Sequence, residues 1–187
     1  MERLPAGEVR TGPAYEADRL SDRARLSAAA GERRLALGTD LVLVFETRET
    51  VRMALEELLR AERIDDGERV AGETAAFAAL LGEEHELAAT LYVDVADPVA
   101  LAERLTELAG VDQAVSLEVG GRRTVARPDP GDSGSGAFHL LFALDSDQRA
   151  ALLAELPASI RVEHPACRAT ATVSASQVLA ISAELKR

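Results

Sequence analysis

The sequence has few aromatic side chains and no long apolar run. Tryptophan is absent and aromatic residues make up 3% of the 187 residues, so a core must be built from aliphatic side chains such as Ala, Leu and Val. No stretch approaches the roughly 20 consecutive apolar residues that cross a bilayer. The first residues, from Met1 to Pro5, also lack an apolar signal segment. We therefore expect a cytoplasmic protein.

Cysteine is equally scarce. The one cysteine, Cys167, excludes an internal disulfide and cannot hold an iron–sulfur cluster alone, because such clusters take about four thiolates. His164 and Cys167 lie three residues apart and could be two zinc ligands or a nucleophile with its base. We favour a turn between strands with an incidental thiol, since no second cysteine exists. The sequence predicts neither a cofactor nor a bound metal.

The charge balance excludes further classes of partner. The chain has 21 basic and 32 acidic residues, for a net charge of −11, and such a surface repels phosphate backbones and anionic lipid headgroups. Nucleic acids and membrane surfaces are therefore poor partners. With 47% hydrophobic and 28% charged residues, the composition is that of a globular chain with one core and room for a small satellite.

The patterning predicts an α+β fold. We expect residues 1–12 to form a flexible arm and residues 13–187 a single domain. A helix begins at Pro13 and reaches about Gly31, followed by a hairpin of residues 34–37 and 41–45. From about Thr47 the apolar period becomes helical, and a second helix follows Gly67, so these two helices form an antiparallel pair.

The second half of the chain shows a strand, a helix and a hairpin, and then the same order again. Asp97 and Asp145 cap the two helices, and an offset of 48 residues superposes them. The passes could be a duplication or unrelated elements in the same order. We expect a mostly antiparallel sheet, with a ferredoxin-like arrangement as one option, and a C-terminal helix from Ser174. A Gly/Ser/Pro-rich flexible loop over residues 128–136 separates the passes.

Two other features have simple structural interpretations. Gly131-Asp132-Ser133-Gly134 spells the nucleophile tetrapeptide of trypsin-like proteases, but we interpret it as part of the loop because that chemistry needs a positioned His and Asp. His139 lies inside an apolar strand, and we interpret it as a hydrogen-bonded core or edge residue.

The densest polar cluster follows the first hairpin. Glu46 and Arg48 end the strand, and the next helix carries further residues of the same types, namely Glu57, Arg60, Glu62 and Arg63. The cluster could bind a carboxylate or phosphate by bidentate contacts, form a solvated lattice of salt bridges, or provide a protein interaction surface. We expect Arg60 to be partly buried against Glu46 or Glu57.

Several segments together resemble the bacterial domain-of-unknown-function family 3501, from about residue 15 to the C-terminal helix. In chain order they are Tyr15-x-x-x-Arg19, Arg33-Arg34-Leu35, Gly38, Phe45-Glu46-Thr47-Arg48-x-Thr50, Glu57-x-Leu59-Arg60-x-Glu62-Arg63-Ile64, Ala89-Thr90-Leu91 and His164-Pro165-Ala166-x-Arg168-Ala169. The chain departs from the family pattern at Ala54, Glu56, Phe77-Ala78 and Cys167.

What the resemblance implies is a redox context. The family has no established activity, but its genes commonly lie beside those of rubrerythrin-like proteins and iron–sulfur oxidoreductases. Since this chain lacks cluster ligands, the resemblance implies an accessory role with one of those proteins as partner. The departures leave Glu46, Arg48, Arg60, Glu62 and His164 as candidate site residues.

Two hypotheses for the function follow. The first is a non-catalytic accessory or binding module for a redox or oxidative-stress system. The alternative is a small enzyme or anionic-ligand sensor that uses the Glu/Arg cluster, with His164 as acid or base. A cavity that collects these side chains favours the alternative, and a face of paired charges favours the first.

Overall fold

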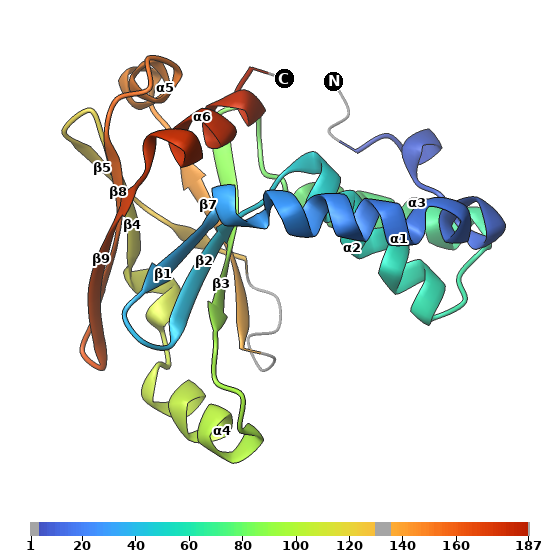
Figure 1. Cartoon of the computed structure of the whole chain (residues 1–187), viewed down its shortest axis with the longest axis horizontal. Coiled ribbons are helices and arrows are strands. Elements are labelled where there is room, and N and C mark those ends of the chain that lie inside the picture. Colours follow the sequence, from blue (N-terminus) through green and yellow to red (C-terminus); the bar gives the residue numbers. More distant parts are fainter. Residues whose placement is uncertain (1–3, 130–135, 187) are drawn as a thin grey trace.

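Two lobes make up the protein, a lobe of two packed sheets and a lobe of three helices that projects from one of them (Figure 1). The computed structural model describes residues 4–129 and 136–186. The central part of the predicted loop, residues 130–135, lies outside the described residues. Among the described residues, no helix combines the length and apolar composition needed to cross a membrane.

The α+β class and the order of elements are confirmed, but the strands divide between two sheets and do not form the single sheet that we expected. Every strand pair is antiparallel. Sheet A has the order β1 (Arg34–Leu37), β2 (Leu41–Phe45), β3 (Glu86–Val93), β7 (Ala137–Ala143) and β6 (Arg127–Pro128). Sheet B has the order β5 (Arg122–Val125), β4 (Val115–Val119), β8 (Ala158–His164) and β9 (Cys167–Val173).

The main core lies between the two sheets. Alternate residues of a strand point to opposite faces, so each sheet presents one apolar face, and fully buried residues such as Leu43, Leu91, Val115 and Ile160 come from both. This alternation explains why the expectation of a single sheet was wrong. The hairpins of the two passes carry an apolar face of their own, and this face is buried when they pack as a second layer on sheet A.

The two passes occupy equivalent places in this architecture. Each sends one strand to sheet A, β3 or β7, then a helix, then a hairpin to sheet B. The helices are α4 (Pro98–Glu107) and α5 (Ser146–Leu153), and the side chains of Asp97 and Asp145 accept a backbone N–H at their first turns as predicted. Because β3 pairs with β7 and β4 pairs with β8, the passes meet at the centre of both sheets.

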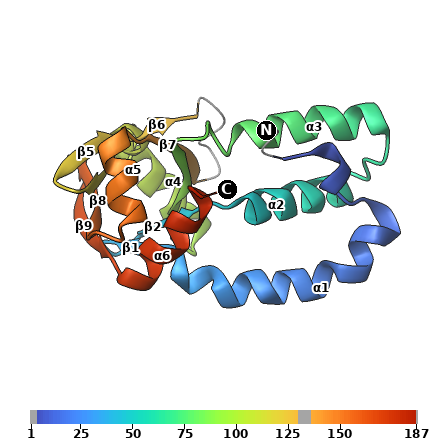
Figure 2. The same ribbon diagram turned by 90° about the horizontal axis from the view of Figure 1, so that it is seen from above.

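The helical lobe contains α1 (Gly12–Ala29), α2 (Arg48–Ala61) and α3 (Gly67–Ala79). Figure 2 shows the three helices side by side, on the side of sheet A that faces away from sheet B. Thr47 and Asp66 cap α2 and α3. A second, smaller apolar cluster holds the lobe together, and its buried members are Leu4, Val51, Leu55, Leu59, Ile64 and Leu81.

Residues 4–12, which we expected to form part of a flexible arm, lie packed against this lobe. Leu4 is fully buried in the small cluster, the short helix η1 (Ala6–Glu8) follows, and Arg10 is hydrogen-bonded to Glu56 on α2. A single leucine among polar residues gives no periodic signal, and its burial depends on a cluster formed by residues far along the chain. The C-terminal helix α6 (Ala175–Glu184), capped by Ser174, closes the sheet lobe.

Candidate functional site

The five predicted site residues lie apart in the structure. Glu46 lies at the end of β2 on sheet A, and Arg48 pairs with Glu8 at the N-terminal segment. Arg60 pairs with Glu16 on α1. The remaining two are Glu62, exposed at the end of α2, and His164, at the end of β8 in sheet B.

His164 has a structural role in the turn after β8. Its Nδ1 accepts a hydrogen bond from the backbone N–H of Ala166 at 3.2 Å. The other nitrogen, Nε2, lies 3.1 Å from the carbonyl oxygen of Ala109 and therefore carries the proton that it donates there. Both ring nitrogens are engaged, which leaves none for the acid–base role that we considered.

The expectation that Arg60 packs against Glu46 or Glu57 is wrong. Arg60 donates to Glu16 at 2.5 Å, and both side chains are about half exposed, at 42% and 52%. Arg60 follows Arg48, the first residue of α2, by 12 residues, which places it roughly 18 Å along the helix. Glu46 precedes that first residue, so the length of the helix separates the two side chains.

The Glu/Arg residues of α2 instead form a lattice with α1. Glu57 accepts from Arg19 at 2.8 Å and lies 3.7 Å from Arg23. Glu49 lies 2.5 Å from Arg25. The hydrogen bond from Arg19 lowers the pKa of Glu57. These pairs join two helices across a polar interface.

A pair with one buried member, Glu56, lies at the base of this lattice. Glu56 is 1% exposed and accepts three hydrogen bonds from Arg10, from the backbone N–H at 2.9 Å, from Nε at 3.0 Å and from Nη2 at 2.8 Å. Arg10 also donates to Asp22 and lies over the ring of Tyr15. Burial, followed by the nearby Glu57, raises the pKa of Tyr15 to about 12. Sequence reasoning did not find this pair, because 46 residues separate its members.

A cavity of about 280 Å³ lies beside the lattice and is lined by Glu8, Arg48, Glu49 and Arg52. Each basic side chain of its lining lies near an acidic one, although Nε of Arg52 has no hydrogen-bond partner among the described residues. Arg48 binds Glu8, and Arg52 lies 3.9 Å from both Glu49 and Glu56. Ligand pockets are ordinarily apolar with a few polar groups, so this wholly charged lining differs from that of a typical ligand pocket.

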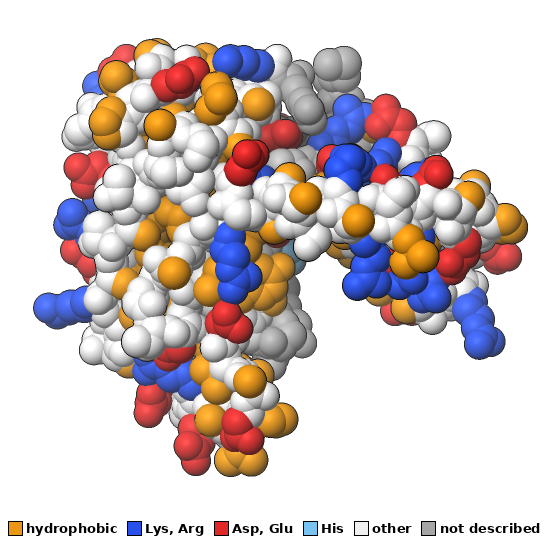
Figure 3. Space-filling model, viewed as in Figure 1, with side chains coloured by type: hydrophobic (Ala, Val, Ile, Leu, Met, Phe, Trp, Pro, Cys, Tyr) orange, Lys and Arg blue, Asp and Glu red, His pale blue; other side chains and the backbone are white. Residues whose placement is uncertain are grey.

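A second polar group of residues lies on the outer face of sheet A, the face turned toward the helical lobe. Glu46 accepts hydrogen bonds from Thr50 Oγ1 and from Thr90 Oγ1, both at 2.6 Å. Thr90, which is 1% exposed, also lies 3.2 Å from Nδ1 of His139 on the neighbouring strand. We call Glu46, Thr50, Thr90 and His139 the outer-face group. Figure 3 shows the concave corner that the helical lobe makes with the sheet lobe.

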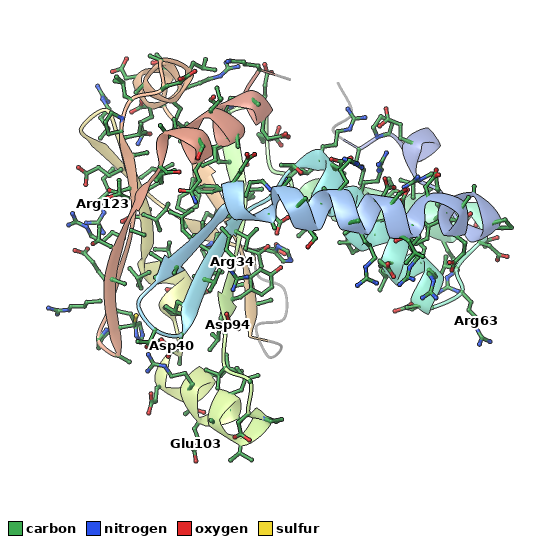
Figure 4. All side chains as sticks on the ribbon, viewed as in Figure 1. Arg34, Asp40, Arg63, Asp94, Glu103 and Arg123 are labelled. Carbon is green, nitrogen blue, oxygen red and sulfur yellow. The ribbon has the colours of Figure 1, made fainter. Side chains whose placement is uncertain are left out.

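Two further features border the outer-face group. Tyr92, two residues along β3, is 40% exposed, and burial, followed by the negative charge of Glu46, raises its pKa. Arg34 on β1 pairs with Asp94 at 2.9 Å, and both side chains are more than half exposed (Figure 4). Glu46, Thr50 and Thr90 belong to segments that carry the family resemblance.

The structure also gives the surroundings of the thiol and of the described carboxylates. Burial, followed by the negative charge of Asp40, raises the pKa of Cys167, which keeps the thiol protonated and unreactive. Among residues 4–129 and 136–186, no group of three or more His, Cys, Asp or Glu side chains is arranged to hold a metal ion.

Comparisons with known proteins give a family for the chain and a similar solved structure. No curated protein matches the chain. A crystal structure of a novel protein of unknown function from Burkholderia pseudomallei K96243 is similar over its whole length, with a TM-score of 0.90, 26% identity, and coverage of 98% of this chain and 99% of that one. The sequence model of the family described as protein of unknown function (DUF3501) matches residues 4–185. The chain therefore belongs to the DUF3501 family.

Proposed function

We propose that this protein is a non-catalytic accessory or binding module for a redox or oxidative-stress system. The surface that docks the partner is the charged face where α1 meets α2. The observation that supports the proposal is the distribution of the Glu/Arg cluster. Arg48, Glu57 and Arg60 each form an ion pair with a different part of the lobe, and the pairs do not converge on one cavity.

Such a face suits reversible protein binding. Exposed ion pairs contribute little to the stability of a fold, so Arg60 and its neighbours exchange an internal carboxylate for one on a partner at small cost. Complementary charge on the partner then sets orientation and association rate. An enzyme or anionic-ligand sensor built on the same cluster has no comparable support, because its candidate residues lie apart.

The identity of the partner rests on the family resemblance. That resemblance implies a rubrerythrin-like protein or an iron–sulfur oxidoreductase, encoded beside the gene. An accessory role also fits the composition of the chain, since one cysteine whose pKa is raised by burial offers no thiolate for electron transfer.

The test is a binding measurement between the purified chain and each of these two proteins from the same cell. Arg60→Glu reverses a charge on the proposed face, and Arg161→Glu is a matched control on sheet B, because the two side chains are 42% and 41% exposed. We expect Arg60→Glu to weaken binding about tenfold and Arg161→Glu to leave it unchanged. The proposal fails if neither protein binds, or if the two variants bind alike.

A further inference from the structure

The hydrogen bonds of the outer-face group define where its protons lie. A threonine hydroxyl has one proton to donate, and Thr90 Oγ1 contacts both Glu46 Oε1 and His139 Nδ1. The 2.6 Å contact with Glu46 has the length of a hydroxyl bond to a carboxylate, which can only accept. The proton of Thr90 therefore goes to Glu46, and the hydrogen-bond network assigns a proton to Nδ1 of His139, which donates to Thr90.

This assignment leaves Nε2 of the neutral imidazole with a free lone pair. Among the described residues Nε2 has no hydrogen-bond partner, and it is not one of the buried polar atoms that lack one, so the described part of the chain does not fully enclose it. A histidine that has one nitrogen fixed by a bond to a carboxylate-linked hydroxyl, and the other nitrogen without a partner, has the arrangement of a positioned base.

The charge of Glu46 reinforces this role. Glu46 is half-buried and is held by two hydroxyl groups, while within the described parts of the chain it forms no ion pair with a basic side chain. A proton taken up at Nε2 would place a positive charge on the imidazole. That charge would be coupled to the carboxylate through the Thr90 hydroxyl, whose dipole is already oriented by Glu46.

The register of sheet A places a basic side chain, that of Arg34, on the same face of the sheet as His139. Arg34 lies opposite Val44, Val44 opposite Thr90, and Thr90 opposite His139. Neighbouring strands are about 4.8 Å apart, so roughly 14 Å separates the Cα atoms of Arg34 and His139. Val44 lies between them, with Tyr92 in the adjacent row of the same face. The Arg34–Asp94 pair is exposed on both sides and is therefore readily exchanged.

We propose that the outer face of sheet A is a binding site for a small carboxylic acid that carries a weakly acidic hydroxyl, such as a phenol, at its far end. Its carboxylate pairs with Arg34, its apolar body lies over Val44 beside Tyr92, and its hydroxyl donates to Nε2 of His139. When the hydroxyl proton moves to Nε2, the products are an imidazolium and a phenolate, while Nδ1–H still donates to Thr90. This site is separate from the protein-docking face proposed above.

The first test reads the tautomer directly. Nitrogen NMR of the intact protein distinguishes a ring protonated at Nδ1 from one protonated at Nε2. We expect His139 to be protonated at Nδ1 and His164 at Nε2, so each ring serves as the reference for the other. A neutral His139 that carries its proton on Nε2 would overturn the proposal.

The second test uses 5-hydroxy-2-nitrobenzoate, whose phenolate form has its own visible absorption band. We expect the protein to increase that band, and His139→Gln to abolish the increase. Thr90→Val and Arg34→Gln should each weaken binding about tenfold, the loss of one charge-assisted hydrogen bond. Thr90→Ser, which keeps the hydroxyl, should restore binding if the role of Thr90 is to orient His139.

Two controls make the result specific. His164→Gln removes a histidine with both nitrogens engaged and should leave the band unchanged. The parent para-nitrophenol lacks the carboxylate, so Arg34→Gln should not affect its binding. An unchanged phenol spectrum with the wild-type protein, or an equal response in His139→Gln and His164→Gln, would refute the site.

Discussion

The two sheets meet through apolar side chains, whereas α1 meets α2 largely through charged ones. Between the sheets lie residues with no exposed surface, such as Leu91 and Ile160. Between the helices lie the pairs of Arg60 with Glu16 and of Arg19 with Glu57. Apolar burial is weakened neither by charge screening nor by protonation, whereas ion pairs are weakened by both. The contact between α1 and α2 should therefore respond more strongly to salt and to acid than the apolar contact between the sheets.

The largest expected effect is in the sheet lobe. Leu91→Ala removes a fully buried side chain from the centre of sheet A and should lower the free energy of unfolding by about 3 to 5 kcal/mol, through lost burial and a cavity. Denaturant unfolding measures this loss. Leu20→Ala makes the same change on a side chain of α1 that is 76% exposed, and it should leave the free energy of unfolding almost unchanged. Similar losses in both would contradict the assigned core.

The next largest effect concerns the pair of Arg10 and the buried Glu56 in the helical lobe. Glu56→Gln removes the charge of the buried carboxylate that accepts from Arg10, while Arg10 keeps Asp22 as a charged partner. We therefore expect a loss of about 2 kcal/mol, that of a hydrogen bond to a charged group. Glu62→Gln, at the exposed end of the same helix, is the control and should be neutral. If unfolding curves show equal effects for the two changes, Arg10 and Glu56 do not anchor the N-terminal segment.

Acid should loosen the helical lobe before the sheet lobe. Hydrogen bonds from Arg10 and Arg19 lower the pKa of Asp22 and Glu57, respectively, in the folded protein. A lowered folded pKa gives stability that is present above the unfolded value and is lost as the pH falls through the folded value. We expect amide exchange in α1 to accelerate from about pH 4.5 downward while β3 and β7 stay protected. Simultaneous opening of both lobes would contradict this.

The smallest effect is that of a single exposed pair. Arg60→Ala should lower the free energy of unfolding by at most about 1 kcal/mol, and by less in high salt, because the pair with Glu16 is exposed and screened. Unfolding curves at low and high salt measure it. The double change with Glu16→Ala should be no worse than the sum of the singles, and a loss near that of Glu56→Gln would mean that Arg60 is buried.

Features set by neighbouring residues were predictable from the sequence. Asp97, Asp145 and Ser174 cap helices through side-chain bonds to residues three positions on, and Gly120 and Gly121 adopt the positive φ of a tight hairpin. These interactions depend on local chemistry alone. The helical boundaries and the first hairpin follow for the same reason.

Features set by distant residues were not predictable. The hydrogen bonds of Thr90 join it to Glu46 and His139, which lie 44 and 49 residues away. A threonine in an apolar strand has the sequence pattern of an ordinary β-strand residue. Its neighbours on the adjacent strands become known only when the strand register is known. The division into two sheets was missed for the same reason, since alternation shows that a strand has a buried face and not which sheet covers it.

The crossing of each pass from sheet A to sheet B also governs how the chain can fold. Strand β4 ends at Val119, but its partner β8 begins only at Ala158. Strand β3 likewise pairs with β7, which is synthesised much later. During synthesis, the apolar faces of the first pass stay uncovered until most of the second has left the ribosome. Such delayed, non-local pairing slows folding and exposes aggregation-prone strands, so a nascent chain halted before residue 158 is the species that most needs a chaperone.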